Sequence, residues 1–408
     1  MPPTSPPDES FLRECRLLLE EVCCNVGRFH LAEKYGVEPG SIGINQEVDL
    51  GRPGCFADIR LTAAGLPPTF VEVKYGYAPT RALAHLQRKY GELTAHLPSG
   101  SHVIVVIDAH RHADRAALEQ GIRGAIHADL SVELWDEARM LAMLRERFGL
   151  KLEAITAESA FEIREAFDEA KGRHAFGDAW NGGPLQSSLL WHFGFWRLGG
   201  LLAAPGRTPE TLLPAGNYRG VVVILADLCS FSAYVRDTRD DEVIRYCLSS
   251  FYAKARYEIL NTGGMLYQFV GDEVIGFYGL PDQPVDYLES ALTCARALVQ
   301  IGDSISNEWQ RQIDRVQQSR GVHIGIAIGD VQVLGLQPFG RARVSAISDA
   351  INLGARLLSA ADSGEIVVSN SFYKNLPLSA QTQFKASETI EAKNLGRINA
   401  WRLSCREY

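Results

Sequence analysis

The chain has 408 residues, of which 46% are hydrophobic, and it carries a formal net charge of −8 at pH 7. This length predicts two or three domains, and the apolar content is sufficient for a separate core in each. The acidic balance argues against a general nucleic-acid coat, because nonspecific binding to nucleic acid depends on a basic surface.

The first residues, MPPTSPPDES, are rich in proline and are followed by alternating helical and strand patterns. Residues 1–9 are predicted to be a disordered tail, because they are rich in proline. They lack the basic and then apolar regions of a signal peptide. Residues 10–150 are predicted to form a small α/β domain. Its expected elements are a helix at 10–35, strands near 56–62, 69–74 and 102–108, a helix at 79–96, and a closing strand and helix within 132–150.

Three ionisable residues of this domain fall on two neighbouring predicted strands. Asp58 lies near the start of one strand, and Glu72 and Lys74 alternate onto one face of the next. Acidic groups with a lysine can bind a metal ion and activate water. The D…ExK pattern, with Gln87 and Tyr90 on the following helix, resembles the restriction-endonuclease-like fold. The resemblance implies a nuclease or a regulatory sensor of nucleic acid or a phage component; an ordinary amphipathic surface strand is the alternative.

Residues 151–214 are predicted to form a helical connector, which begins with an amphipathic helix and is interrupted by Gly-Pro turns. Its most apolar stretch, residues 187–204, contains His192, Arg197 and several glycines. A membrane-spanning helix needs about 20 apolar residues, so we expect no membrane anchor. The eight cysteines show no C-x-x-C pairs or zinc spacing, which is typical of reduced thiols and predicts a cytoplasmic protein.

Two acidic strand ends follow in the C-terminal half. The run VVVILAD predicts a buried strand that ends at Asp227, and GGMLYQFVGDEVIGFYG predicts a hairpin with Asp272 at its tip. Either acid alone would more often be a helix cap or a turn residue. Together, carboxylate oxygens and substrate phosphates suit magnesium, and paired ions can clamp both the attacking and the leaving oxygen of a phosphoryl transfer.

Residues 345–358, SAISDAINLGARLL, are predicted to be helical. Asn352 and Arg356 are four residues apart in this stretch and would share one face of the helix. A neutral hydrogen-bonding side chain and a permanent cation would then point the same way. For this pair considered alone, a polar helix face exposed to solvent is the alternative interpretation.

Five motifs make residues 217–403 similar to the catalytic domain of class III nucleotidyl cyclases, the adenylate and guanylate cyclase family. In family order they are ADLCSFS, LYQFVGDEV, HIGIAIGDV, DAINLGARL and AKNLGRINAWRL. We therefore assign residues 215–408 to a cyclase domain. The resemblance implies an α+β, ferredoxin-like fold with helices on one face of a sheet, working as a head-to-tail homodimer with sites at the interface.

The resemblance also implies roles for individual residues. Asp227 and Asp272 would hold two Mg²⁺ or Mn²⁺ ions per active site, with the backbone carbonyl of Leu228 as a further ligand. Residues Cys229 to Ser232 would begin the next helix, where free backbone N–H groups receive the triphosphate.

Three further residues would act on the nucleotide from the partner subunit, so the resemblance implies an inactive monomer. Asn352 would orient the ribose, Arg356 would stabilise charge on the α-phosphate, and Lys393 would contact the outer phosphates. The implied reaction is an in-line attack of the ribose 3′-OH on the α-phosphorus. It closes a 3′,5′-cyclic nucleotide and expels pyrophosphate.

The residues expected to read the base depart from both purine signatures of the family. Gln268 stands where adenylate cyclases usually carry lysine and guanylate cyclases glutamate, and Ser345 stands where adenylate cyclases carry threonine or aspartate. An amide both donates and accepts hydrogen bonds, which suits uracil or cytosine as well as adenine. Phe231 could narrow the pocket or stack on a small ring. Strand alternation predicts that Tyr267 and Phe269 face away from Gln268.

This combination looks most like the pyrimidine cyclases of bacterial antiphage (Pycsar-type) systems, which make cyclic UMP or cyclic CMP as a signal for a separate effector. We therefore predict UTP, or CTP, as the substrate. Three alternatives stay open: an adenylate cyclase with a regulatory N-terminal domain, a nuclease whose cyclase-like half only binds nucleotide, and a diguanylate cyclase. The last is suggested only by the tripeptide Gly271-Asp272-Glu273.

Overall fold

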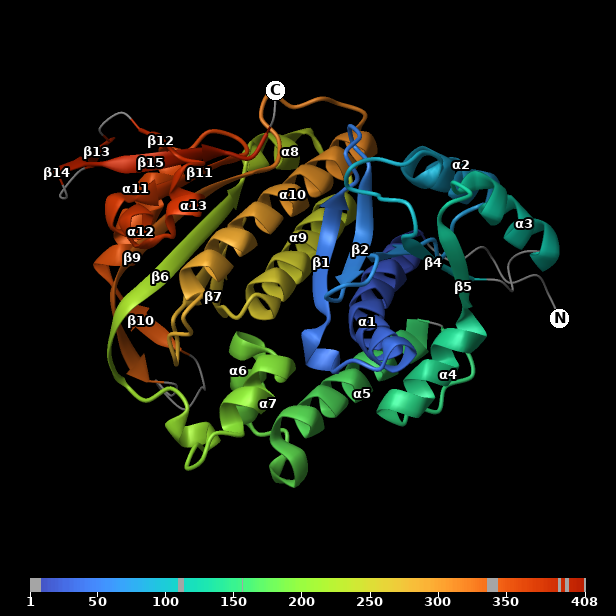
Figure 1. The fold of residues 1–408 in the computed structure, drawn as a ribbon, viewed down its shortest axis with the longest axis horizontal. Coiled ribbons are helices and arrows are strands. Elements are labelled where there is room, and N and C mark those ends of the chain that lie inside the picture. Colours follow the sequence, from blue (N-terminus) through green and yellow to red (C-terminus); the bar gives the residue numbers. More distant parts are fainter. Residues whose placement is uncertain are drawn as a thin grey trace. The chain divides into compact units, whose positions relative to one another are not determined.

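A computed structural model describes residues 9–108, 114–155, 157–335, 344–387, 390–392 and 396–406. Residues 1–8 of the predicted tail lie outside this part of the chain, and Glu9 already belongs to the first helix. The chain divides into two compact units, Met1–Ala170 and Lys171–Tyr408, which we describe separately (Figure 1).

The N-terminal unit is built on a five-stranded sheet. Its elements are α1 (Glu9–Tyr35), the 3₁₀ turn η1 (Pro39–Ser41), β1 (Gly43–Asp49), β2 (Phe56–Thr62), β3 (Thr69–Val73), α2 (Pro79–Tyr90), β4 (His102–Ile107), α3 (Arg115–Ala125), β5 (Ser131–Asp136) and α4 (Glu137–Phe148). The strands are adjacent in chain order; β1, β2 and β3 pair antiparallel, whereas β4 and β5 extend the sheet in parallel.

Most of the elements predicted for this unit are present, but one helix is shorter than predicted and two elements were not predicted. The helix predicted over 79–96 ends at Tyr90, where Gly91 closes the last turn. The strand β1 and the helix α3 were not predicted, because β1 is mostly polar in sequence and α3 contains two glycines. Every residue of β3 and β4 is buried, as expected for central strands of a sheet covered on both faces.

The helix α5 (Ala157–Phe176) crosses the boundary between the units, and the C-terminal unit continues from it. The remaining elements are η3 (Gly177–Ala179), α6 (Pro184–Phe193), α7 (Phe195–Leu202), η4 (Pro209–Thr211), β6 (Gly216–Leu228), α8 (Phe231–Asp237), α9 (Asp241–Asn261), β7 (Met265–Val270), β8 (Glu273–Tyr278), α10 (Tyr287–Ile313), β9 (Val322–Gly335), β10 (Ser345–Ile347), α11 (Asp349–Ser359), β11 (Glu365–Ser369), α12 (Asn370–Asn375), α13 (Leu378–Gln381), β12 (Lys385–Ala386), β13 (Ile390–Ala392), β14 (Gly396–Ile398) and β15 (Ala400–Ser404).

The main sheet of this unit has the strand order β12-β15-β11-β9-β6-β8-β7, with β10 paired to β9. Its two faces are both covered: α9 and α10 pack on one face, and α6, α7 and α11 pack on the other (Figure 1). The expectation of helices on one face only is therefore wrong. The physical reason lies in β6, whose residues 221–226 are all buried, so that apolar side chains on both sides of the strand need a covering layer.

The stretch predicted as one helix over residues 345–358 is divided in the structure. Ser345 begins the short strand β10, and the helix α11 starts only at Asp349. Ser348 lies between them in extended backbone, and its hydroxyl accepts a hydrogen bond from the Ala350 backbone nitrogen at 3.0 Å. A serine cap of this kind ends the strand and begins the helix, so Ser345 is a strand residue.

A β-bulge in β7 changes which side chains share a face. The pairing with β8 shifts by one residue between Leu266 and Gln268, so that Tyr267 is an extra residue in the strand. As a result Tyr267 packs with the core on the α11 side, and Phe269 packs with the core on the α9 side. The prediction that Tyr267 faces away from Gln268 is wrong, whereas Phe269 lies on the opposite face from Gln268, as predicted. Gln268 pairs with Ile275, whose side chain lies on the same side as Tyr267.

Two glycines allow α11 to pack directly on the sheet. A Cβ atom on Gly325 of β9 would collide with the carbonyl oxygen of Gly354 and lie 2.5 Å from the Leu358 nitrogen, both in α11. A Cβ on Gly354 would collide with Leu225 of β6. The position of α11 over the sheet therefore depends on the absence of side chains at these two residues.

Replacing Gly325 by alanine is expected to destabilise the C-terminal unit by about 1–3 kcal/mol or more, the usual cost of overpacking a close contact. The clash involves backbone atoms of α11, which cannot move aside like a flexible side chain. Gly200→Ala in α7 is the matched control, because nothing lies within 4 Å of the added methyl group. Urea unfolding of both variants measures the difference, and equal stabilities would contradict the packing described.

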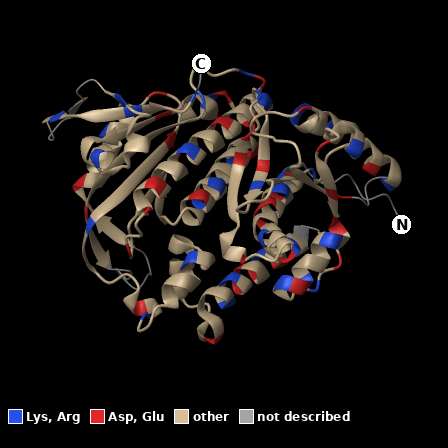
Figure 2. Cartoon of the chain, viewed as in Figure 1, with Lys and Arg blue, Asp and Glu red and all other residues tan. Residues whose placement is uncertain are grey.

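Acidic and basic residues are interspersed along the helices of both units (Figure 2). In the described part of the chain, no helix is both long and apolar enough to cross a membrane. All eight cysteines are free thiols, and seven of them are buried.

Candidate active site

Two carboxylates meet at one end of the C-terminal sheet. Asp227 is the penultimate residue of β6, and Asp272 lies with Gly271 in the two-residue turn between β7 and β8. Gly271 has a φ of 65°, the left-handed conformation that such turns require. Because β6 pairs with β8 and sets Asp227 opposite Glu273, the turn holds Asp272 beside Asp227. The two carboxyl groups lie close enough to interact, since Asp227 raises the pKa of Asp272.

The proximity of these acids is electrostatically unfavourable without a cation. Burial and the negative charge of Asp227 raise the pKa of Asp272 to about 7. The same two causes raise the pKa of Glu273 above its ordinary value. Carboxyl groups that share one site resist ionising together, and a positive charge placed between them relieves the repulsion.

His323 is a further member of this site, and the sequence reasoning missed it. It lies on β9 opposite Asp227, with Nε2 3.3 Å from Asp227 Oδ2 and Nδ1 3.1 Å from the Ala361 carbonyl oxygen. Burial lowers the pKa of His323, but the hydrogen bonds to Asp227 and Ala361 outweigh it, and the pKa is raised overall. The imidazole therefore holds the Asp227 carboxylate in one orientation. Knowledge of the antiparallel pairing of the VVVILAD and HIGIAIG runs would have revealed it.

The donor atoms at this end of the sheet fit a hard divalent cation. Asp227 and Asp272 offer carboxylate oxygens, and the backbone carbonyl of Leu228 follows directly on Asp227. Leu228 is anchored by a buried side chain, with 4% of its surface exposed. Within the described ranges, no group of three or more His, Cys, Asp or Glu is arranged to hold a metal. Mg²⁺ often binds through one or two carboxylates together with substrate phosphates and water.

The raised pKa of Asp272 predicts how the metal-free protein responds to pH. The pKa of Asp272 is about 7 in the folded chain, whereas its ordinary value is 3.8. The unfolded chain therefore loses the Asp272 proton at a lower pH than the folded chain does. Stability should therefore fall as pH rises from about 4 to about 7. Asp272→Asn should flatten this slope, whereas Asp286→Asn, which removes an exposed carboxylate, should not. Thermal unfolding in EDTA measures both, and an unchanged slope in Asp272→Asn would count against the coupling.

The exposed face of α11 presents Asn352 and Arg356. Both side chains are exposed, one turn apart, and the opposite face of the helix buries Ala350, Leu357 and Leu358 against the sheet. Neither side chain makes a hydrogen bond or ion pair with the part of the same chain that the structure describes. A permanent cation and an amide are thus available to a ligand or to another subunit.

The two residues expected to read the base lie next to a contact between β7 and β10. The Tyr267 hydroxyl accepts a hydrogen bond from the Ala346 backbone nitrogen at 3.2 Å and donates to its carbonyl oxygen at 3.4 Å. Gln268 follows Tyr267 and is exposed, and Ser345 precedes Ala346 and is half-buried. The structure therefore brings together the immediate neighbours of Gln268 and Ser345.

Phe231 and Cys229, which were also expected at the site, make contacts within their own chain. Phe231 begins α8 and packs edge-on against Trp309, with ring centroids 6.0 Å apart, so its ring belongs partly to the core. The Cys229 N–H, expected to be free for a phosphate, already donates to the Gly321 carbonyl oxygen at 2.9 Å. Lys393 lies outside the described residues.

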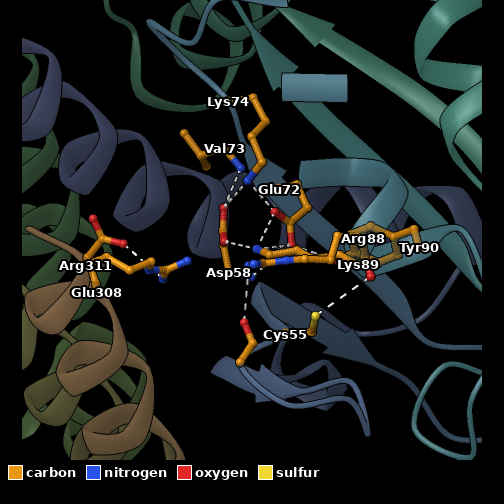
Figure 3. Close-up of polar contacts among 11 residues, drawn as sticks. Cys55, Asp58, Glu72, Val73, Lys74, Arg88, Lys89, Tyr90, Glu308 and Arg311 are labelled. Carbon is orange, nitrogen blue, oxygen red and sulfur yellow. Dashed lines mark hydrogen bonds and ion pairs between the residues drawn. The ribbon is translucent and has the colours of Figure 1, made fainter. Parts of the chain in front are cut away.

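The N-terminal unit brings its three singled-out residues together. Lys74 Nζ is 3.4 Å from Asp58 Oδ2 and is also bonded to Glu72, and these groups face one another between β2 and β3 (Figure 3). The sequence reasoning expected Gln87 and Tyr90 of α2 near this cluster. Tyr90 donates to Glu72 at 2.8 Å, but Gln87 is exposed; its place beside the carboxylates is taken by Lys89.

Comparison with known families identifies the C-terminal part of the chain. Residues 213–404 match the family described as "Adenylate and Guanylate cyclase catalytic domain", a little under half of the chain. This segment, from the residues before β6 to the end of β15, is thus a class III cyclase catalytic domain. The match does not extend to the N-terminal unit.

Among solved structures, the chain is similar to the guanylyl cyclase Cya2, with 19% identity over 47% of this chain and 93% of that chain, and a TM-score of 0.41. It is also similar to the adenylyl cyclase CyaB from P. aeruginosa, with 20% identity over 47% and 95% of the two chains and a TM-score of 0.41. For the guanylate cyclase domain of RhGC from Catenaria anguillulae, the identity is 18%, the coverage is 47% and 100%, and the TM-score is 0.37. No curated protein matches the chain.

Proposed function

We propose that the C-terminal unit is a metal-dependent nucleotidyl cyclase that converts a nucleoside triphosphate to its 3′,5′-cyclic monophosphate and pyrophosphate. The observation that carries the proposal is that strand pairing places Asp227 opposite Glu273, the neighbour of Asp272, within a segment that matches the cyclase family. Two interacting carboxyl groups, one with its pKa raised to about 7, form a site that favours cations.

Asp227, Asp272 and the Leu228 carbonyl would hold two Mg²⁺ or Mn²⁺ ions. When bound, these ions would neutralise the triphosphate and clamp the attacking and leaving oxygens. His323, at 3.3 Å from Asp227 Oδ2, would keep that carboxylate oriented toward the substrate.

The rest of the site would come from a second copy of the chain. Asn352 and Arg356 are exposed and have no partner within the described part of their own chain, which supports a role at an interface. Asn352 would orient the ribose so that its 3′ oxygen bonds to the α-phosphorus, while the 3′-hydroxyl proton is released to water. As the bond from that phosphorus to the β-phosphate oxygen breaks and pyrophosphate leaves, Arg356 would stabilise the charge on the α-phosphate. Lys393 would contact the outer phosphates.

The proposed substrate is UTP, or CTP, because neither purine signature is present. The Gln268 amide and the Ser345 hydroxyl can each donate and accept hydrogen bonds. The hydrogen bond between Tyr267 and Ala346 supports a pocket to which their neighbours Gln268 and Ser345 both contribute. A site that hydrogen-bonds one base edge rejects others, since a wrong base leaves buried polar groups unpaired.

Replacing both base-reading residues tests this proposal. The double variant Gln268→Lys, Ser345→Asp restores the adenylate cyclase pattern. We expect the ratio of kcat/KM for UTP to that for ATP to fall at least ~10-fold. Gln318→Lys, which makes the same glutamine-to-lysine change at an exposed position elsewhere in the unit, should leave the ratio unchanged. A wild-type preference for ATP would assign the protein to the adenylate cyclases instead.

The proposed product would serve as a second messenger, in keeping with the resemblance to antiphage pyrimidine cyclases, and the N-terminal unit would be its regulatory part. Cells that express the wild-type chain with its neighbouring genes should resist phage, whereas cells that express Asp227→Asn should not. Equal resistance in both strains would show that any role in defence does not require the cyclase site.

A further inference from the structure

The acidic pair of the N-terminal unit is bridged by a lysine from outside the D…ExK pattern. Lys89 Nζ in α2 lies 3.0 Å from Asp58 Oδ1, 3.0 Å from Glu72 Oε1 and 2.8 Å from Glu72 Oε2 (Figure 3). One ammonium group thus touches both carboxylates, one on β2 and the other on β3. Three elements meet at this single nitrogen atom.

All four carboxylate oxygens of the pair already have donors. Besides Lys89, the second oxygen of Asp58 accepts from the Val73 backbone nitrogen at 2.8 Å and from Lys74 Nζ at 3.4 Å. For Glu72, one oxygen accepts from the Tyr90 hydroxyl at 2.8 Å, and the other from Lys74. The cluster therefore satisfies its own hydrogen-bonding groups without an external ligand.

The charges of the cluster also balance. Asp58 and Glu72 supply two negative charges, and Lys74 and Lys89 supply two positive charges. Glu72 is 0% exposed and Lys89 is 9% exposed, so the ion pairs are shielded from water. Burial lowers the pKa of both lysines, but the charges of Asp58 and Glu72 outweigh it and raise the pKa of each. Both lysines thus stay charged, and removing either would leave two buried carboxylates with a single lysine between them.

A divalent cation does not fit this donor set. It would need several oxygen ligands from Asp58 and Glu72, the same oxygens that Lys89 contacts. A cation between the two carboxylates would have to displace the Lys89 ammonium and would then lie beside Lys74, a second positive charge. The donor set is that of a lysine-filled site, although the D…ExK pattern alone suggests a metal site.

We propose that Lys89 is a built-in cation that takes the place of a metal ion between Asp58 and Glu72, so that the N-terminal unit does not cleave nucleic acid by metal-dependent hydrolysis. The cluster instead ties α2 to β2 and β3. This proposal does not depend on the cyclase activity proposed for the other unit.

Manganese binding to the full chain tests the proposal. The parent protein carries Asp227→Asn and Asp272→Asn, which remove the proposed cyclase ligands, and is stripped with EDTA. Titration with Mn²⁺, followed by electron paramagnetic resonance, should show no bound ion that depends on Asp58.

Adding Lys89→Met to the parent should create one Mn²⁺ site at least ~10-fold tighter than any in the parent, because freed carboxylates are ligands for this ion. Further addition of Asp58→Asn should abolish that site. Arg88→Met, at the exposed neighbouring residue, is the matched control and should create none.

Each outcome supports or overturns the proposal. An Asp58-dependent Mn²⁺ ion in the parent would overturn it, and so would a folded Lys89→Met protein that binds no Mn²⁺. The unmodified chain is also incubated with plasmid and Mg²⁺ or Mn²⁺, where cleavage that Asp58→Asn abolishes would contradict the proposal. If neither Lys89→Met nor Lys89→Gln folds, the parent titration and the plasmid assay still decide. None of these measurements depends on cyclase turnover.

Discussion

Replacing Arg356 by alanine is expected to leave a folded protein whose kcat is lowered by roughly 10³ to 10⁵, the range that a well-placed arginine contributes in related phosphoryl transfers. Arg356 is exposed on α11 and makes no hydrogen bond or ion pair within the described part of its chain. The charge that it supplies is required only when the α-phosphate is attacked. The loss should therefore appear in kcat and not in the temperature of unfolding.

Two further variants sharpen this prediction. Arg356→Lys keeps the charge but loses the planar donor geometry, so it should recover only part of the activity. Arg311→Ala removes an exposed arginine from α10, and it should retain full turnover. Initial rates of pyrophosphate release measure all three. Near-normal turnover by Arg356→Ala would remove this residue from the proposed mechanism.

Asp227→Asn should also abolish turnover, and mixing it with Arg356→Ala should restore part of the activity. In a head-to-tail dimer, a mixed pair has one site with both defects and one site with neither. Because half of the dimers are mixed and half of their sites are intact, about a quarter of the wild-type rate should return. Neither variant alone should be active at the same total concentration.

This complementation tests the composite site independently of the base. The two variants are denatured and refolded together, and native mass spectrometry confirms that mixed dimers form. Arg356→Ala refolded with itself is the control for recovery by refolding alone. Mixed dimers without activity would show that Asp227 and Arg356 serve the same subunit's site.

The elements that carry the C-terminal site could be predicted because their signals are local. An apolar run before Asp227, a glycine turn at Asp272 and the i, i+4 spacing of Asn352 and Arg356 each lie within a few residues of sequence. The strand, the hairpin and the helix are all present in the structure. The proximity of the two aspartates then follows from the pairing of β6 with β8.

What could not be predicted depends on register and on contacts distant in sequence. His323 is 96 residues from Asp227, and only the antiparallel pairing of β6 with β9 reveals that they meet. The bulge at Tyr267 shifts the strand by one residue, which no alternation rule anticipates. Lys89 of α2 contacts Glu72 of β3, which is 17 residues away in the sequence. In each case the three-dimensional arrangement, and not the residue type, determines the contact.

Product analysis tests most directly whether this chain converts a nucleoside triphosphate to its 3′,5′-cyclic monophosphate. The purified protein is incubated with Mn²⁺ and each of ATP, GTP, CTP and UTP, and the products are identified by mass spectrometry, with Asp227→Asn as the matched inactive control. We predict a 3′,5′-cyclic mononucleotide, cyclic UMP or cyclic CMP, and an equal amount of pyrophosphate from the wild-type protein alone. No cyclic mononucleotide from any of the four substrates, or only a dinucleotide product, would contradict the proposed function.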